Sequence, residues 1–143
     1  MGTLAVAVGN PLRRDDGVAH QVLQHLDCES RSFLQLTPEV AAVIAHYDTV
    51  VFIDADARSA EVRIESVPEA ETTSALTHCS GPSEVVALSK ALFGFTGRAL
   101  LCRIPVRDMS YGSGLSPRVE ALVAHTAQQL LDPLGIGSLR TGS

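Results

Sequence analysis

Hydrophobic residues along this chain fall into two alternating patterns. Continuous apolar runs of strand length occupy residues 3–8, 50–55 and 98–104, as expected for strands that are covered on both faces. Between them, apolar residues spaced three and four apart predict helices near 18–26, 38–47, 82–92 and 117–132. This alternation predicts one α/β domain over residues 1–143, a three-layer sandwich in which helices flank both faces of a twisted, mostly parallel sheet of about five strands.

Four segments are less regular. A short apolar stretch at 33–36 predicts a further strand, and the alternation over 61–66 predicts a strand with one exposed face at an edge of the sheet. Residues 67–77 are mostly polar and show no apolar period, so we interpret them as a long connection. The Gly- and Ser-rich end of the chain is expected to fray from about residue 134.

The composition of the chain argues against several classes of function. Of 143 residues, 45% are hydrophobic and 19% are charged, which is typical of a folded globular protein. The net charge is -5 and the 11 Lys and Arg are scattered, so nucleic acid is not an expected partner. With no run of about 18 apolar residues and no signal-like N-terminus, we expect a cytoplasmic protein without membrane contact. Sequence motifs for nucleotide phosphates, zinc peptidases and nucleophile elbows are absent.

The most distinctive stretch is the turn at 9–17, which joins the first strand to the first helix. It begins with Gly9 and Asn10, which suit a tight turn, and carries two adjacent carboxylates, Asp15 and Asp16. Acidic residues at the start of a helix stabilise its N-terminus, so capping is one interpretation of both. A functional site is the other.

Two further residues favour the site. Asp54 ends the strand at 50–55, and His78 opens the loop before the third helix. Because the carboxyl ends of parallel strands share one edge of the sheet, Asp16, Asp54 and His78 are candidates for a common site there. Two carboxylates and one imidazole make an open three-ligand site for a divalent transition metal. Asp54 alone would also serve as a turn residue, and Asp56 is an alternative ligand.

The other candidate side chains have simpler interpretations. The three cysteines are widely spaced, which argues against a disulfide framework. Cys102 lies in an apolar run and is interpreted as a core residue, whereas Cys79, next to His78, is kept open as a ligand or nucleophile. His20 and His25 are five residues apart, on different faces of a helix, and are expected to be solvated.

A resemblance rests on five motifs in order. They are Gly9-Asn10-Pro11-Leu12 with Asp15-Asp16-Gly17, Gln35-Leu36-Thr37-Pro38-Glu39, Phe52-Ile53-Asp54-Ala55, His78 before an amphipathic helix, and Gly114-Leu115-Ser116-Pro117-Arg118-Val119-Glu120. From about Leu4 to Leu131 the chain resembles the hydrogenase maturation proteases, small cytoplasmic endopeptidases that remove the C-terminal extension of nickel-iron hydrogenase large subunits.

The resemblance implies a function for the trio. Asp16, Asp54 and His78 match the metal-binding residues of the family, and the nickel they recognise is the one already inserted in the large-subunit precursor, so neither a resident metal nor an organic cofactor is required. The first of these positions is frequently Glu in the family and is Asp16 here, which shortens its reach by one methylene.

Several chemical alternatives stay open at the level of sequence. Hydrolysis would follow either from polarisation of the scissile carbonyl by the metal or from a carboxylate, Asp16 or Asp54, acting as general base on water. Covalent catalysis is the least expected route, because no Ser or Cys nucleophile with an adjacent base is evident in the sequence. The same edge would also suit a metal- or small-ligand-binding module without peptidase activity, or a scaffold that only docks on the precursor.

Overall fold

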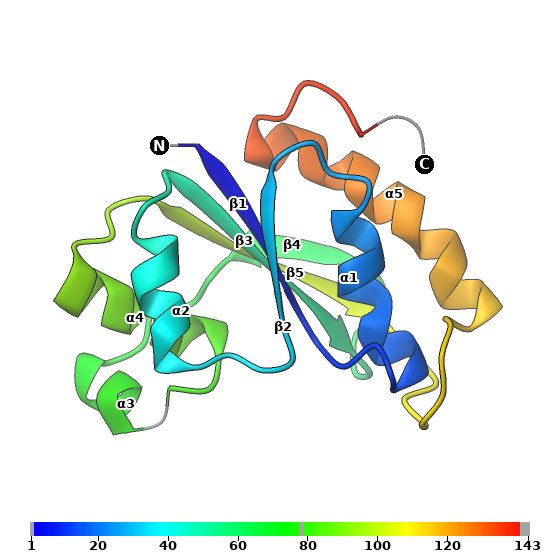
Figure 1. The fold of residues 1–143 in the computed structure, drawn as a ribbon, viewed down its shortest axis with the longest axis horizontal. Coiled ribbons are helices and arrows are strands. Elements are labelled where there is room, and N and C mark those ends of the chain that lie inside the picture. Colours follow the sequence, from blue (N-terminus) through cyan, green and yellow to red (C-terminus); the bar gives the residue numbers. More distant parts are fainter. Residues whose placement is uncertain (1, 78, 141–143) are drawn as a thin grey trace.

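A computed structural model describes residues 2–77 and 79–140 of the chain (Figure 1). The elements in chain order are β1 (Thr3–Val8), the 3-10 helix η1 (Arg14–Gly17), α1 (Val18–Leu23), β2 (Glu29–Phe33), α2 (Pro38–Ile44), β3 (Thr49–Asp56), β4 (Arg63–Ser66), α3 (Thr72–Thr77), α4 (Pro82–Phe93), β5 (Arg98–Pro105) and α5 (Pro117–Leu134). None of the helices in the described residues combines the length and the hydropathy that crossing a membrane requires.

The strands form one sheet of five in the described part of the chain, in the order β2-β1-β3-β5-β4. All neighbours pair in parallel except β4, which runs antiparallel to β5 at the edge. This confirms the predicted mostly parallel sheet. After β1 the chain adds β2 on one side, and it then crosses to place β3 on the other side, so the connections diverge between β1 and β3. Such a divergence is where open α/β sheets place their binding crevice, at the carboxyl ends of the strands.

Helices cover both faces of the sheet, as predicted (Figure 1). Helices α1 and α5 pack on the face that includes Val51 and Ile53 of β3. Helices α2, α3 and α4 cover the opposite face, which includes Val50 and Phe52. Because side chains alternate along a strand, Asp54 continues the row of Val50 and Phe52 and belongs to the α2/α4 face.

Two local predictions are wrong. The strand expected at 33–36 is β2, Glu29–Phe33, and its first four side chains are exposed, so no apolar run marked its position. The segment 67–77 was expected to be a connection but contains α3. Its Ala75 is fully buried against the α2/α4 cluster, so this helix depends on packing rather than on an apolar period.

The end of the chain is attached as far as Arg140, where fraying was expected from about residue 134. Leu139 forms an isolated antiparallel bridge with Leu26, and Arg140 N donates to His25 O over 2.8 Å. Ile136 and Leu139 pack against the α1/α5 cluster, so burial of two apolar side chains holds a segment whose composition suggested a loose tail.

Candidate functional site

The turn after β1 fixes the carboxylate of Asp16. Gly9 has φ 145°, and a Cβ placed on it would lie 2.1 Å from the backbone oxygen of Asp16, so this position requires glycine. Asn10 N donates to Asp16 Oδ2 over 2.7 Å, and Asn10 Oδ1 accepts from Leu12 N over 2.9 Å. The predicted turn role of Gly9 and Asn10 is therefore visible in the hydrogen bonds that hold Asp16 at the end of β1.

His20 belongs to the same turn, although solvation was expected. Its Nε2 lies 2.8 Å from the carbonyl oxygen of Gly9 and donates to it, and the side chain is half-buried. The helix α1 begins directly after the turn and folds back along it, so its first turn brings the imidazole over Gly9. The sequence spacing of His20 and His25 could not reveal a contact that depends on this fold-back.

Asp54 lies next to this turn at the carboxyl end of β3. It is paired in register with Val8, the last residue of β1, on the neighbouring strand. Burial, and after it the negative charge of Asp16, raise the pKa of Asp54 from 3.8 to about 6. The structure therefore places Asp16 close enough to Asp54 for their charges to interact, at the point between β1 and β3 where the chain connections diverge.

A network of charged side chains flanks Asp54 on the side of β5. Arg103, which pairs in register with Asp54, binds Glu65 Oε1 over 2.9 Å and reaches Asp56 Oδ2 at 4.0 Å. Asp56 also accepts hydrogen bonds from Arg58 N and Ser59 Oγ, which lower its pKa. Asp56, considered as an alternative ligand, is therefore engaged in its own turn. Arg103 is shared between two other acids and only partly offsets the charge of Asp54.

Asp15, the neighbour of Asp16, has a different role from either interpretation of the sequence. Its side chain is fully buried, and its Oδ2 accepts from Arg107 N, Asp108 N and Ser116 Oγ over 3.0, 2.8 and 2.9 Å. Its Oδ1 accepts from Ser116 N over 2.7 Å. Burial alone would raise the pKa of Asp15, but these hydrogen bonds lower it below 3.8.

Both acids lie in the first turn of η1, as the capping interpretation expected, but no side-chain hydrogen bond caps η1 or α1, so neither acid is a capping residue. Asp15 instead fastens the loop after β5 to the turn after β1. Further backbone bonds join the two segments: Asp15 N donates to Asp108 O over 2.9 Å, and Gly112 N donates to Leu12 O over 2.8 Å. We call residues 9–17 and 106–116 together the turn–loop unit. The sequence offered no signal for it, since its two halves are about a hundred residues apart.

The third predicted ligand, His78, lies outside the described residues. Its neighbour Cys79 packs against the α2/α4 cluster, which is the face that carries Asp54. Burial, followed by the charges of Glu84 and Glu39, raises the pKa of the Cys79 thiol, which opposes a nucleophilic thiolate. Cys102 is fully buried with its pKa raised to about 12 by burial, which confirms it as a core residue.

The donor set of the described residues fits a divalent cation shared with another molecule. Asp16 and Asp54 supply oxygen ligands and repel one another, and a cation between them would remove that repulsion. Within residues 2–77 and 79–140, no group of three His, Cys, Asp or Glu side chains is arranged to hold a metal ion. Two carboxylates by themselves leave most coordination positions to be filled by a partner.

Comparisons with known proteins establish the fold. No protein-family model and no curated protein matches the chain. Among solved structures, the hydrogenase maturating endopeptidase HybD from E. coli is 19% identical with a TM-score of 0.66, covering 98% of this chain and 96% of that one. The [NiFe] hydrogenase maturation protease HybD from Thermococcus kodakarensis is 22% identical, with a TM-score of 0.64 and coverage of 94% and 99%.

A third structure, the [NiFe] hydrogenase maturation protease HycI from Thermococcus kodakarensis KOD1, is 18% identical with a TM-score of 0.69, covering 94% of this chain and 92% of that one. These likenesses extend over nearly the whole of both chains. They confirm that this chain has the α/β fold that the sequence pattern predicted.

Proposed function

We propose that this protein is an endopeptidase of the hydrogenase maturation protease type, which removes the C-terminal extension from the nickel-loaded large-subunit precursor of a nickel-iron hydrogenase. The observation that carries the proposal is the meeting of Asp16 and Asp54 at the divergence between β1 and β3. It occurs in a fold shared over nearly its full length with proteins named as hydrogenase maturation proteases. Composition without a basic cluster and the absence of nucleotide motifs agree with a protein substrate.

Nickel enters this reaction as part of the substrate. Asp16, Asp54 and His78 would contact it, each filling a position that the precursor leaves open. The carboxylate pair supports this role, because it is negatively charged near neutral pH and its neighbouring cation, Arg103, is shared between Glu65 and Asp56. A precursor without nickel would bring no charge to balance the pair and would bind less well.

Hydrolysis would proceed with water as the nucleophile. Water attacks the carbon of the scissile carbonyl, a carboxylate of the pair accepts the proton that water loses, and that proton passes to the leaving amine as the peptide bond breaks. Asp54, with a pKa of about 6, holds a proton acceptor poised near neutrality. The raised pKa of Cys79 argues against a covalent thioester route.

Incubation with purified precursor tests the proposal. Nickel-loaded and metal-free precursors are mixed with the protein, and intact mass spectrometry reports whether the C-terminal extension is released. We expect release from the nickel-loaded form only. Efficient cleavage of the metal-free form would remove the nickel-reading role and leave a carboxylate-dependent peptidase.

The same experiment separates the other classes. Retention of nickel by the protein without cleavage would identify a metal-binding module, and stable association without either would identify a docking scaffold. The control variant Asp27→Asn changes an exposed carboxylate away from the carboxyl edge and should cleave like the unaltered protein.

A further inference from the structure

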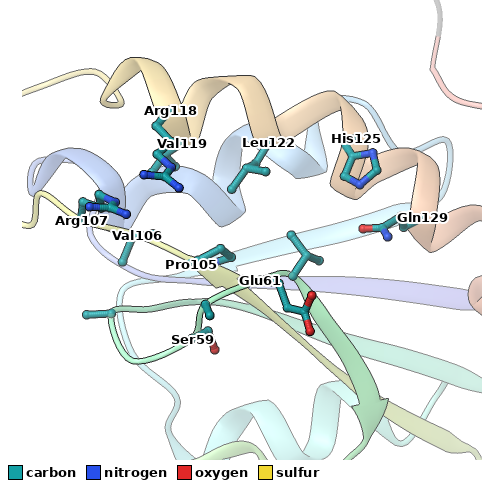
Figure 2. Close-up of a pocket in the computed structure, with 13 residues that line it drawn as sticks. Ser59, Glu61, Pro105, Val106, Arg107, Arg118, Val119, Leu122, His125 and Gln129 are labelled. Carbon is teal, nitrogen blue, oxygen red and sulfur yellow. The ribbon is translucent and has the colours of Figure 1, made fainter.

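A cavity of about 780 Å³ opens at the same edge of the sheet, on the α5 face (Figure 2). It lies between the residues that follow β3, the end of β5, and the first four turns of α5. Its volume falls in the range of about 300–1,000 Å³ that is usual for ligand sites. Val106, Val119 and Leu122 give it an apolar wall. Asp16, Asp54, Arg103 and its acidic partners do not line the cavity, whereas Ser59, which donates to Asp56, does.

One end of the cavity is cationic. Figure 2 shows Arg107 and Arg118 at one end of the cavity and His125 farther along α5, with Glu61 on the opposite wall. In the described residues neither Arg107 nor Arg118 forms an ion pair with an acidic side chain, whereas Arg14 and Arg103 do so. Two guanidinium groups with no acidic partner in that part of the chain therefore lie along one cavity. They provide charge complementarity for a carboxylate, which Arg binds in a forked geometry.

The buried carboxylate of Asp15 positions both arginines. It accepts hydrogen bonds from the backbone of Arg107 and from Ser116, which precedes the α5 turn that carries Arg118. The two guanidinium groups therefore extend from segments that are fixed to one another, although their exposed side chains remain free to rotate. A preorganised backbone of this kind lowers the entropy lost when a ligand binds.

The cavity and Asp54 are separated by the thickness of the sheet and by a short distance along β3. Asp54 faces α2 and α4, whereas Ala57, three residues later, lines the cavity on the α5 face. Three residues of extended strand span about 10 Å. A polypeptide that passes over the carboxyl edge must also cross the thickness of the sheet, so it needs more than three extended residues to reach from Asp54 to the cavity.

We infer that this cavity binds the free C-terminal carboxylate of a polypeptide, with Arg107 and Arg118 contacting the carboxylate and the apolar wall contacting the last side chains. The inference rests on the proposed function for the identity of that polypeptide, which is the C-terminal extension of the precursor. The extension would then be held at its end by the α5 face while the bond to be cut lies at Asp16 and Asp54. It must therefore extend more than three residues beyond the cut.

Peptide binding tests the inference without cleavage. The probe is a fluorescein-labelled Gly-Ser-Gly-Ala-Val-Leu peptide with a free carboxyl terminus, compared with its C-terminal amide and with an amide that carries one internal Glu. Fluorescence anisotropy gives the three dissociation constants. For the unaltered protein we expect the free acid to bind about fivefold more tightly than either amide, the upper end of what an exposed charge contact produces.

The variant Arg107→Gln/Arg118→Gln should lose this preference. The matched control Arg31→Gln/Lys90→Gln removes the same charge from exposed positions on β2 and α4 and should keep it. Circular dichroism verifies that each variant is folded. Equal binding of acid and amide by the unaltered protein, or a preference that survives in Arg107→Gln/Arg118→Gln, would overturn the inference. So would an internal Glu that binds as well as the terminal carboxylate.

The outcome is independent of the proposed function. Cleavage of precursor with no acid preference in the peptide assay would reject this inference alone. An acid preference that depends on the two arginines, in a protein that fails to cleave nickel-loaded precursor, would reject the proposed function and leave a carboxylate-binding site.

Discussion

The two faces of the sheet carry opposite charges at its carboxyl edge. Asp54 lies on the α2/α4 face, where burial, and after it the negative charge of the neighbouring Asp16, raise its pKa to about 6. The α5 face presents Arg107 and Arg118, which border a cavity. Asp15, one residue from Asp16, serves the second face, where four hydrogen bonds stabilise its charge. The comparison shows that hydrogen bonds determine the roles of these two adjacent carboxylates. Asp15 accepts four hydrogen bonds and is structural, whereas Asp16 accepts a single one within the described residues, from Asn10 N, and remains available for chemistry.

The largest effect is expected on the acidic face. Asp54→Asn and Asp16→Asn each remove a carboxylate from the pair, and cleavage of nickel-loaded precursor should fall by about 10³-fold, within the range that general acid–base groups contribute. The measurement is the initial rate of extension release. Cys79→Ser, on the same face, should cleave at the unaltered rate, since the raised pKa of its thiol opposes nucleophilic catalysis. Loss of cleavage in Cys79→Ser with normal rates in the Asp variants would reverse the assignment.

Stability should respond most strongly at Asp15. Asp15→Asn keeps the shape of the side chain but replaces an acceptor oxygen with an NH₂ group that faces backbone N–H donors, and we expect a loss of about 3 kcal/mol in the free energy of unfolding. Urea denaturation measures it. Asp132→Asn, an exposed position on α5, is the control and should change stability by less than about 0.5 kcal/mol. A stable Asp15→Asn variant would show that the turn–loop unit does not depend on this charge.

The pH dependence of stability should have opposite signs for the two acids. For Asp54 the folded-state pKa of about 6 exceeds the ordinary 3.8, so the native state binds more protons between these values and stability falls as pH rises through this window. The loss is about 2 kcal/mol once solvent screening of this half-buried group is allowed for. For Asp15 the pKa is lowered, so its contribution is present above 3.8 and is lost as pH falls through the lower folded-state value.

The variant Asp54→Asn isolates the contribution of Asp54 to the pH dependence of stability. Its urea midpoint should equal that of the unaltered protein near pH 4 and exceed it at pH 7, so this variant becomes more stable while it loses cleavage. A pH profile that is identical in the two proteins would contradict the raised pKa.

The smallest expected changes in stability come from two buried hydroxyl groups, one on each face of the sheet. Ser89 in α4 donates to Ala41 O over 2.6 Å, and Ser89→Ala should cost about 1 kcal/mol. Thr126 in α5 is fully buried, and its Oγ1 has no hydrogen-bond partner within the described residues. Thr126→Val should therefore be neutral or stabilise by up to about 1 kcal/mol, measured by thermal unfolding. A Thr126→Val variant as destabilised as Ser89→Ala would show that this hydroxyl is bonded in solution.

Sequence patterns predicted the elements that bury a continuous apolar face. Strands β1, β3 and β5 were located within one residue at each end, because both of their faces are covered. The strand β2 was misplaced because its first four side chains are exposed, and α3 was missed because, among its side chains that the structure describes, Ala75 is the buried one. The spacing of apolar residues indicates which elements bury a face. It therefore gives no signal for an edge strand with exposed side chains or for a short helix that packs through a few contacts.

The site was predictable where strand ends alone position the residue. Asp16 follows β1, and Asp54 lies near the carboxyl end of the neighbouring parallel strand β3, and that suffices to bring them to one edge. The distinction between Asp15 and Asp16 was not predictable, because it depends on donors from residues 107–116. The contribution of Arg103 and Glu65 depends on the antiparallel register of β4 with β5, which no local motif specifies. Residues that act through distant segments leave no signal in their own neighbourhood of the sequence.

The distant partners of Asp15 also set an order of events during synthesis. Its hydrogen-bond donors lie 92, 93 and 101 residues later in the chain. A ribosome that makes the protein from its N-terminus releases the turn after β1 long before Ser116 emerges, and closing so large a loop is slow compared with local folding. The turn after β1 therefore gains the hydrogen bonds of Asp15 only after residue 116 has been made. The two neighbouring acids therefore reach their final contacts at different times, because Asp16 and Asp54 can meet once β1 and β3 have paired, whereas Asp15 is fastened only after residue 116 has been made.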